Sequence, residues 1–137
     1  MKKTDFSAEQ VMTFRKNFNG LLIESFGPDV LILNLESSEP FWFLCRPKGW
    51  SSKIRLNYKP LLGAPHVVDV EFYENPEHYA KIAPPIGATV VNHPSCVSFD
   101  FAVPKIDIRT PFEENTEALS IVIARMAQLK TWVEAQG

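Results

Sequence analysis

The chain has few of the residues that usually mark chemistry in a small protein. Its 137 residues include only two cysteines, Cys45 and Cys96, and three histidines. Two cysteines make no disulfide framework, and no pair of Cys or His residues has the C-x-x-C or H-x-x-x-H spacing of a zinc site. A glycine-rich phosphate loop, a G-x-S-x-G nucleophile motif and a paired-carboxylate motif are also missing. We therefore predict no metal, no cofactor and no catalytic residue.

Strong charge and long apolar runs are missing as well. The net charge of −2 argues against a nucleic-acid or anionic-membrane partner. No apolar run approaches the ~20 residues of a membrane span, and no apolar segment follows the lysines at positions 2 and 3 as it would in a signal peptide. Together with the two cysteines, which suit a reducing compartment, these features predict a soluble cytoplasmic protein.

Hydrophobic and aromatic residues are abundant. They include ten Phe and three Trp, and hydrophobic residues make up 45% of the chain. That composition is typical of a folded protein, and this length is typical of one domain. A chain of this size buries roughly two-thirds of its unfolded surface. We expect residues 1–137 to form a single domain with an aromatic-rich core.

Two segments carry the signals of helices. In Asp5–Gly20, Ser7 and Gln10 have the spacing of a capping box, and the Asn19-Gly20 pair is a typical helix end. In Pro111–Ala135, Thr110 stands at the N-cap position and apolar residues recur at helical spacing. We predict a helix in each segment.

The region between these helices indicates an antiparallel sheet. Residues 21–58 contain four apolar runs separated by turn residues, which is typical of a meander of strands. Val30–Leu33 and Phe41–Leu44 are apolar throughout, so we expect them in the middle of the sheet. Thr89–Val91 and Cys96–Val103 follow as later strands. The predicted fold is α+β: an antiparallel sheet of about six strands with an N-terminal helix and a long C-terminal helix packed on it.

The alternation of charged and apolar residues predicts a register for one strand pair. If Lys53 lies opposite Glu71, then Arg55 lies opposite Asp69. Opposite charges would meet on a solvent-exposed face, and aliphatic residues would meet on the core face.

Self-association is the first functional hypothesis. Ile121 and Trp132 lie away from the main apolar stripe of the C-terminal helix, at positions that a monomer would expose together. Trp50 stands at the tip of a turn, and Trp often contributes strongly to interfaces. These three residues predict a non-catalytic protein-interaction module, with a homodimer or another protein as partner.

Two other functions stay open. Trp42, Phe99, Phe101 and Met126 could line a pocket for an apolar small molecule between the sheet and the C-terminal helix. Alternatively, Cys96 could be the nucleophile of a hydrolase with His93, three residues before it, as base. No flanking motif of a cysteine enzyme and no third residue that would orient His93 accompany this pair, so we assign neither a catalytic role.

A basic segment is a weak sign of nucleic-acid binding. Residues 46–59 contain five basic residues and no acidic one, together with Trp50 and Tyr58. Basic and aromatic residues in alternation suit single-stranded nucleic acid. Two of the five basic residues, Lys53 and Arg55, have predicted carboxylate partners and the net charge is negative, so nucleic acid is not the expected partner.

Overall fold

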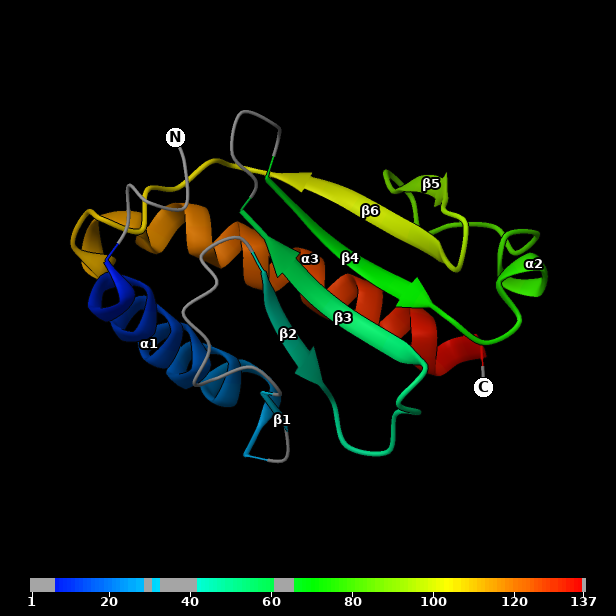
Figure 1. Cartoon of the computed structure of the whole chain (residues 1–137), viewed down its shortest axis with the longest axis horizontal. Helices are drawn as coiled ribbons and strands as arrows, with labels where there is room; N and C mark the ends of the chain where they lie inside the picture. The colour runs from blue at the N-terminus through cyan, green and yellow to red at the C-terminus, as the bar shows by residue number, and fades with distance from the viewer. Residues whose placement is uncertain (1–6, 29–30, 33–41, 61–65, 137) are drawn as a thin grey trace.

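The computed structural model describes residues 7–28, 31–32, 42–60 and 66–136. Within these ranges, an antiparallel sheet packs against two long helices, α1 (Ala8–Phe26) and α3 (Thr116–Gln136) (Figure 1). The remaining elements are β1 (Leu31–Ile32), β2 (Phe43–Arg46), β3 (Ile54–Lys59), β4 (His66–Phe72), α2 (Pro76–Tyr79), β5 (Thr89–Asn92), β6 (Val97–Val103) and the 3-10 helix η2 (Phe112–Asn115). The predicted α+β fold is confirmed, with five strands of four residues or more and the two-residue β1. No helix in the described ranges is long and apolar enough to cross a membrane.

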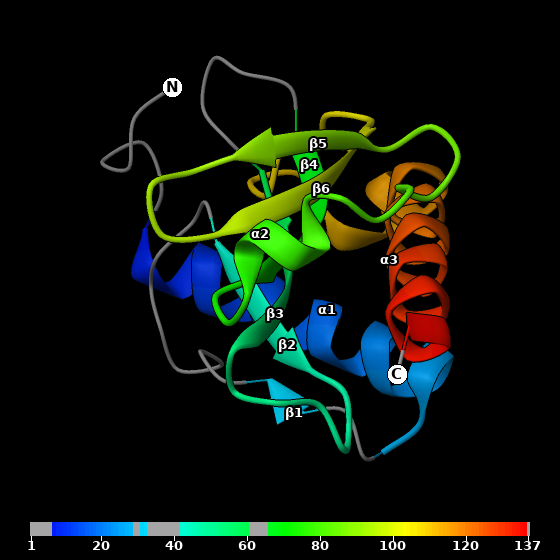
Figure 2. The same ribbon diagram turned by 90° about the vertical axis from the view of Figure 1, so that its right-hand side faces the viewer.

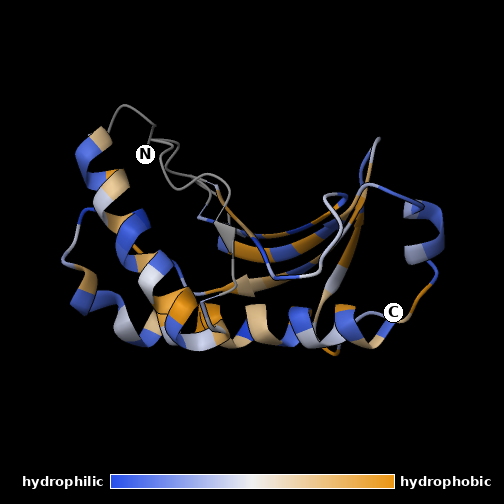
Figure 3. Ribbon diagram, turned by 90° about the horizontal axis from the view of Figure 1, so that it is seen from below, coloured by the Kyte–Doolittle hydropathy of each residue, from blue (hydrophilic) through white to orange (hydrophobic). Residues whose placement is uncertain are grey.

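Helix α3 lies along one face of the sheet, where it contacts β3, β4 and β6, and α1 packs against α3 (Figures 2 and 3). The strand order is β1-β2-β3-β4-β6-β5. The expectation that residues 30–33 form a central strand is therefore wrong, because β1 is at the edge of the sheet. The segment 41–44 contributes to β2, the second strand, and the centre consists of β3, β4 and β6. The turn predicted around residues 37–40 lies outside the described residues.

Helix α1 starts as predicted but continues further. The Ser7 hydroxyl accepts a hydrogen bond from the Gln10 N–H at 3.0 Å, and the Gln10 side chain accepts one from the Ser7 N–H at 2.9 Å. The helix passes through Gly20 and ends at Gly27, which has a φ of +90°. A mid-helix glycine costs ~1 kcal/mol relative to alanine. Continuing the helix buries Leu22 completely, which contributes about 2 kcal/mol or more. The strand predicted from residue 21, and the hairpin after it, are therefore wrong.

The predicted register of β3 and β4 is wrong by two residues. Arg55 lies opposite Glu71, and Asn57 lies opposite Asp69. Because side chains alternate with a period of two, this shift leaves every residue on its predicted face. The observed register lets β3 extend to Lys59, which reaches both carboxylates.

The core is built between the sheet and the helices. Phe99 and Phe101 of β6 are fully buried there, as their alternation predicted. The apolar stripe of α3 is also confirmed, although the first predicted turn is the separate segment η2 and the Thr110 side chain does not cap α3. The buried residues of this stripe are Leu119, Val122, Met126, Leu129 and Val133.

Candidate functional sites

The three residues predicted to form an interface differ in their exposure. Ile121 is 40% exposed on α3. Trp132 instead packs against the core, with its ring 4.6 Å from that of Phe99, and its indole N–H donates to the Ala83 carbonyl at 3.2 Å. The expectation that Trp132 is exposed beside Ile121 is wrong, because the loop before β5 and the end of the sheet reach this flank of the helix. Trp50 is half-buried and donates to Glu134 of α3 at 3.3 Å.

The four residues of the predicted apolar pocket do not line one cavity. Phe99, Phe101 and Met126 are close-packed core residues. Trp42 lies on the opposite side of the sheet, where its indole N–H donates to Asn57 at 2.9 Å. A cavity of about 10 Å³ touches Met126, and that volume is too small for a ligand.

The cysteine and histidine of the hydrolase hypothesis have separate partners. The His93 Nε2 atom is 3.1 Å from the Ser98 hydroxyl, whereas the Cys96 sulfur is 4.0 Å from a Glu71 carboxylate oxygen. Burial and the charge of Glu71 raise the pKa of Cys96. The thiolate is the nucleophilic form, and a raised pKa lowers the fraction of thiolate at neutral pH. This geometry therefore does not activate Cys96.

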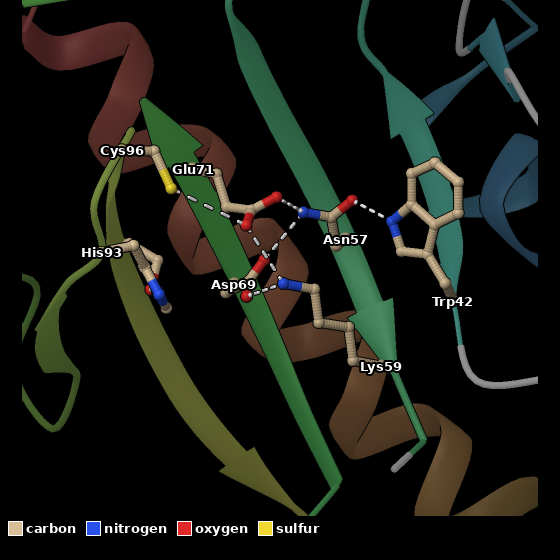
Figure 4. A network of polar contacts seen from close by, with 8 residues as sticks. Trp42, Asn57, Lys59, Asp69, Glu71, His93 and Cys96 are labelled. Carbon is tan, nitrogen blue, oxygen red and sulfur yellow. Dashed lines mark hydrogen bonds and ion pairs between the residues drawn. The ribbon is translucent and has the colours of Figure 1, made fainter. Parts of the chain in front are cut away.

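The most elaborate arrangement of polar side chains lies on the outer face, by which we mean the face of the sheet turned away from α3 (Figure 4). The Asn57 amide nitrogen donates to Asp69 at 2.9 Å and to Glu71 at 2.7 Å. The Lys59 ammonium donates to the same two carboxylates, at 2.8 Å and 3.2 Å. The Trp42 indole completes the set through Asn57. We call these five residues the outer-face network.

This network is buried although it is rich in charge. Asp69 is 2% exposed and Glu71 is 8% exposed. Burial raises the pKa of Asp69 to about 7, against the opposing effect of the Lys59 charge. Burial alone would lower the pKa of Lys59, but the two carboxylates raise it above its ordinary value. Perturbed groups of this kind often occur at functional sites, and they also occur in structural ion-pair networks.

A third carboxylate borders the network. Asp100 of β6 lies directly opposite Asp69 of β4. Burial raises the pKa of Asp100, while a hydrogen bond from Ser98 opposes that rise. The Asp100 Oδ1 atom is buried and has no hydrogen-bond partner. Within the described residues, no group of His, Cys, Asp and Glu side chains has the geometry to hold a metal ion.

A second surface of interest is the outer edge of β5. This strand pairs with β6 on one side only, and no described strand lies beyond it (Figure 2). Its sequence, Thr89–Asn92, has no charged residue and no proline. The loop that leads into it presents Ile86, which is 96% exposed. Natural edge strands are usually protected by charge, proline or a bulge, and within the described residues β5 shows only its short length of four residues.

Sequence reasoning missed both surfaces, although it included some of their residues. Asp69 and Glu71 were predicted to face solvent, and the alternating pattern does not distinguish a solvated face from a covered one. Asn57 received no role. A signal was nevertheless present, since Asn57 and Lys59 alternate on β3 as Asp69 and Glu71 do on β4.

No protein-family model, no curated protein and no solved structure matches this chain.

Proposed function

We propose that the protein is a non-catalytic protein-interaction module of the cytoplasm that self-associates through strand β5. The observation that carries this proposal is the uncharged outer edge of β5, which no strand of the described ranges pairs, beside the exposed side chain of Ile86. An exposed edge presents backbone N–H and C=O groups that a further strand can satisfy, and strand addition is a common mode of protein recognition.

The composition of β5 favours a second copy as the partner. In a two-fold antiparallel pairing each strand faces its own sequence, so a charged residue near the centre would face a like charge. Residues that lie directly opposite each other share a sheet face, so the two-fold axis passes through a residue position and not between two residues. In a pairing centred on β5 that residue is Val90 or Val91, which then lies opposite its own copy. Both give contacts between uncharged β-branched side chains, which suit paired strands. Ile86 would add apolar contact beside this pairing.

The other two hypotheses have less support. The residues expected to line an apolar pocket pack against one another in the core. The raised pKa of Cys96 keeps this residue in the thiol form at neutral pH. Both cysteines are buried and unbonded to each other, which agrees with a reducing compartment.

Sedimentation equilibrium of the wild type and Val91→Lys tests the proposal. Lysine on an edge strand opposes pairing, and Val91 is half-buried, so we expect a folded variant. The wild type should dimerise, and Val91→Lys should weaken dimerisation by about tenfold or more, the loss that ~1.4 kcal/mol produces. Ile86→Ser should weaken it by a smaller factor. Circular dichroism of each variant verifies the fold.

Ile121→Lys is the matched control, because it adds the same charge at an exposed apolar position on α3. It should leave the dimer intact. A wild type that stays monomeric at millimolar concentration contradicts self-association. A dimer that Ile121→Lys disrupts and Val91→Lys does not would show that α3 forms the interface instead.

A further inference from the structure

We infer that β5 pairs with a second copy of itself around Val91, in a register that joins the two sheets into one continuous antiparallel sheet. The inference rests on the proposed self-association through β5 and adds which residue lies on the two-fold axis. A pairing centred on Val91 places Val90 of each copy opposite Asn92 of the other. A pairing centred on Val90 would instead place Asn92 opposite Ala88.

The hydrogen bonds between β5 and β6 show which backbone groups face the open edge of the sheet. The His93 N–H donates to the Cys96 carbonyl at 2.9 Å, and these two residues continue the register of the β5–β6 pair. Hydrogen-bonded and non-hydrogen-bonded pairs alternate along an antiparallel ladder. The backbone groups of Val91 therefore face β6, and those of Val90 and Asn92 face the outer edge. Within the described residues, no backbone group pairs with these outward groups.

The outward groups are self-complementary in the Val91 register. Val90 and Asn92 each offer one N–H donor and one carbonyl acceptor. When Val90 lies opposite Asn92 of the other copy, every outward donor and acceptor of both strands finds a partner. In the Val90 register the Asn92 carbonyl would face the Ala88 N–H, which already donates to the Pro85 carbonyl at 3.0 Å. The Val91 register avoids that conflict.

The ladder also ends without a loose donor in this register. The next outward-facing pair would join Ala88 with Pro94 of the other copy. The Ala88 N–H is bonded to Pro85, and proline has no N–H, so neither residue leaves a donor unpaired. Between this pair and the axis, Thr89 lies opposite His93, so no like charges meet.

The side chains of the two valines favour the same axis. Val90 lies opposite Phe99 and already packs against the core. Val91 lies opposite Ser98 on the outer face and is half-buried, so a second copy can cover its remaining apolar surface. Opposite residues of a non-hydrogen-bonded pair approach most closely, with Cα atoms about 4.5 Å apart. Val91 and its copy would form such a pair on the axis.

Disulfide trapping tests the register. Val91→Cys should give a covalent dimer with oxidised glutathione, because directly opposite residues have the Cα separation of roughly 4.4–6.8 Å that a disulfide needs. Val90→Cys is the matched control, since the two copies of residue 90 would be diagonal neighbours about 7–8 Å apart. On non-reducing gels the linked fraction of Val91→Cys should exceed that of Val90→Cys about fivefold or more. Wild type gives the background, because Cys45 and Cys96 are buried.

Sedimentation of the same variants under reducing conditions separates the register from the proposed function, and circular dichroism verifies that each variant is folded. A dimer in which Val90→Cys links and Val91→Cys does not would overturn the Val91 register and leave self-association standing. A dimer in which both variants link equally, or neither links, would overturn the register as well. Variants and wild type that all sediment as monomers would overturn the register together with the proposed function.

Discussion

Ionisation of Asp69 should make the folded protein less stable as the pH rises from 5 to 8.5. In the unfolded chain this carboxyl has its ordinary pKa of 3.8, and burial raises the pKa in the folded protein to about 7. The folded state therefore binds a proton that the unfolded state has already lost. Stability from this group is complete below pH 3.8 and is lost as the pH rises toward 7. From pH 5 to pH 8.5 the loss corresponds to the two pH units between pH 5 and the folded pKa, at ~1.36 kcal/mol each, or about 2.7 kcal/mol. That is a large share of the ~5–15 kcal/mol stability of a typical domain.

Urea unfolding of the wild type and Asp69→Asn at both pH values measures this loss. Asparagine does not titrate, so the free energy of unfolding of the variant, relative to wild type, should rise by about 2.7 kcal/mol between pH 5 and 8.5. Taking the difference removes contributions that both proteins share. One is His66, whose pKa is lowered by burial and by Lys105, so that it stabilises the fold as the pH rises.

Asp107→Asn is the matched control. Hydrogen bonds from Arg109 lower the pKa of Asp107 below its ordinary value, so this group is ionised in both states at pH 5 and above. Its difference from wild type should stay constant over the same range. A constant difference for Asp69→Asn as well, within about 0.5 kcal/mol, would refute the raised pKa of Asp69.

Two further predictions follow from the placement of Trp132 and Cys96. Trp132→Ala should lower the free energy of unfolding, measured in urea, by about 2–3 kcal/mol, because the Trp132 ring packs against Phe99. The loss is smaller than for a fully buried Trp, since Trp132 is only half-buried. Thr131→Ala changes an exposed neighbour and is the control, and an equally small effect of both substitutions would contradict the packing of Trp132. Cys96 should react with iodoacetamide at pH 7.5 more slowly than free cysteine, because its pKa is raised, and faster reaction would revive the hydrolase hypothesis.

The elements that the sequence predicted well are those whose signal is local and periodic. The apolar stripe of α3 and the alternation of β6 each extend over several repeats, and both elements formed as expected. The capping box at Ser7 is also local, since it needs only four consecutive residues.

The end of α1 depended on packing that a local pattern does not contain. Leu21–Phe26 is a short apolar run after a glycine, which fits a strand or the last turns of a helix equally well. The helix is favoured because Leu22 continues the buried stripe of Val11, Phe14 and Phe18. Tertiary contact therefore outweighed the stop signal at Gly20.

The register of β3 and β4 was missed because exposed charge pairs are weak determinants. Each pair of this kind contributes ~0.2–1 kcal/mol, and a shift by two residues keeps the apolar face intact. The observed shift gives Lys59 two carboxylate partners and places Asn57 between them. Contacts made by buried polar groups decided a register that alternation alone left open.

The same reasoning explains why the outer face was the hardest part to predict. Alternation assigns Asp69 to the face away from the core, and in a sheet covered on one side that face is wet. In this protein Asp69 and Glu71 on that face are buried as well, so these charged residues must find partners on neighbouring strands. One partner strand, β3, precedes β4 directly in the chain, and its polar residues can be recognised from the sequence. The other, β6, follows only after β5, so the apposition of Asp69 and Asp100 follows from the strand order and not from any motif. Two like charges placed opposite each other would ordinarily argue against that pairing. The pairing is nevertheless present, so the order of the strands, and not the charge of one residue pair, decided which strands became neighbours.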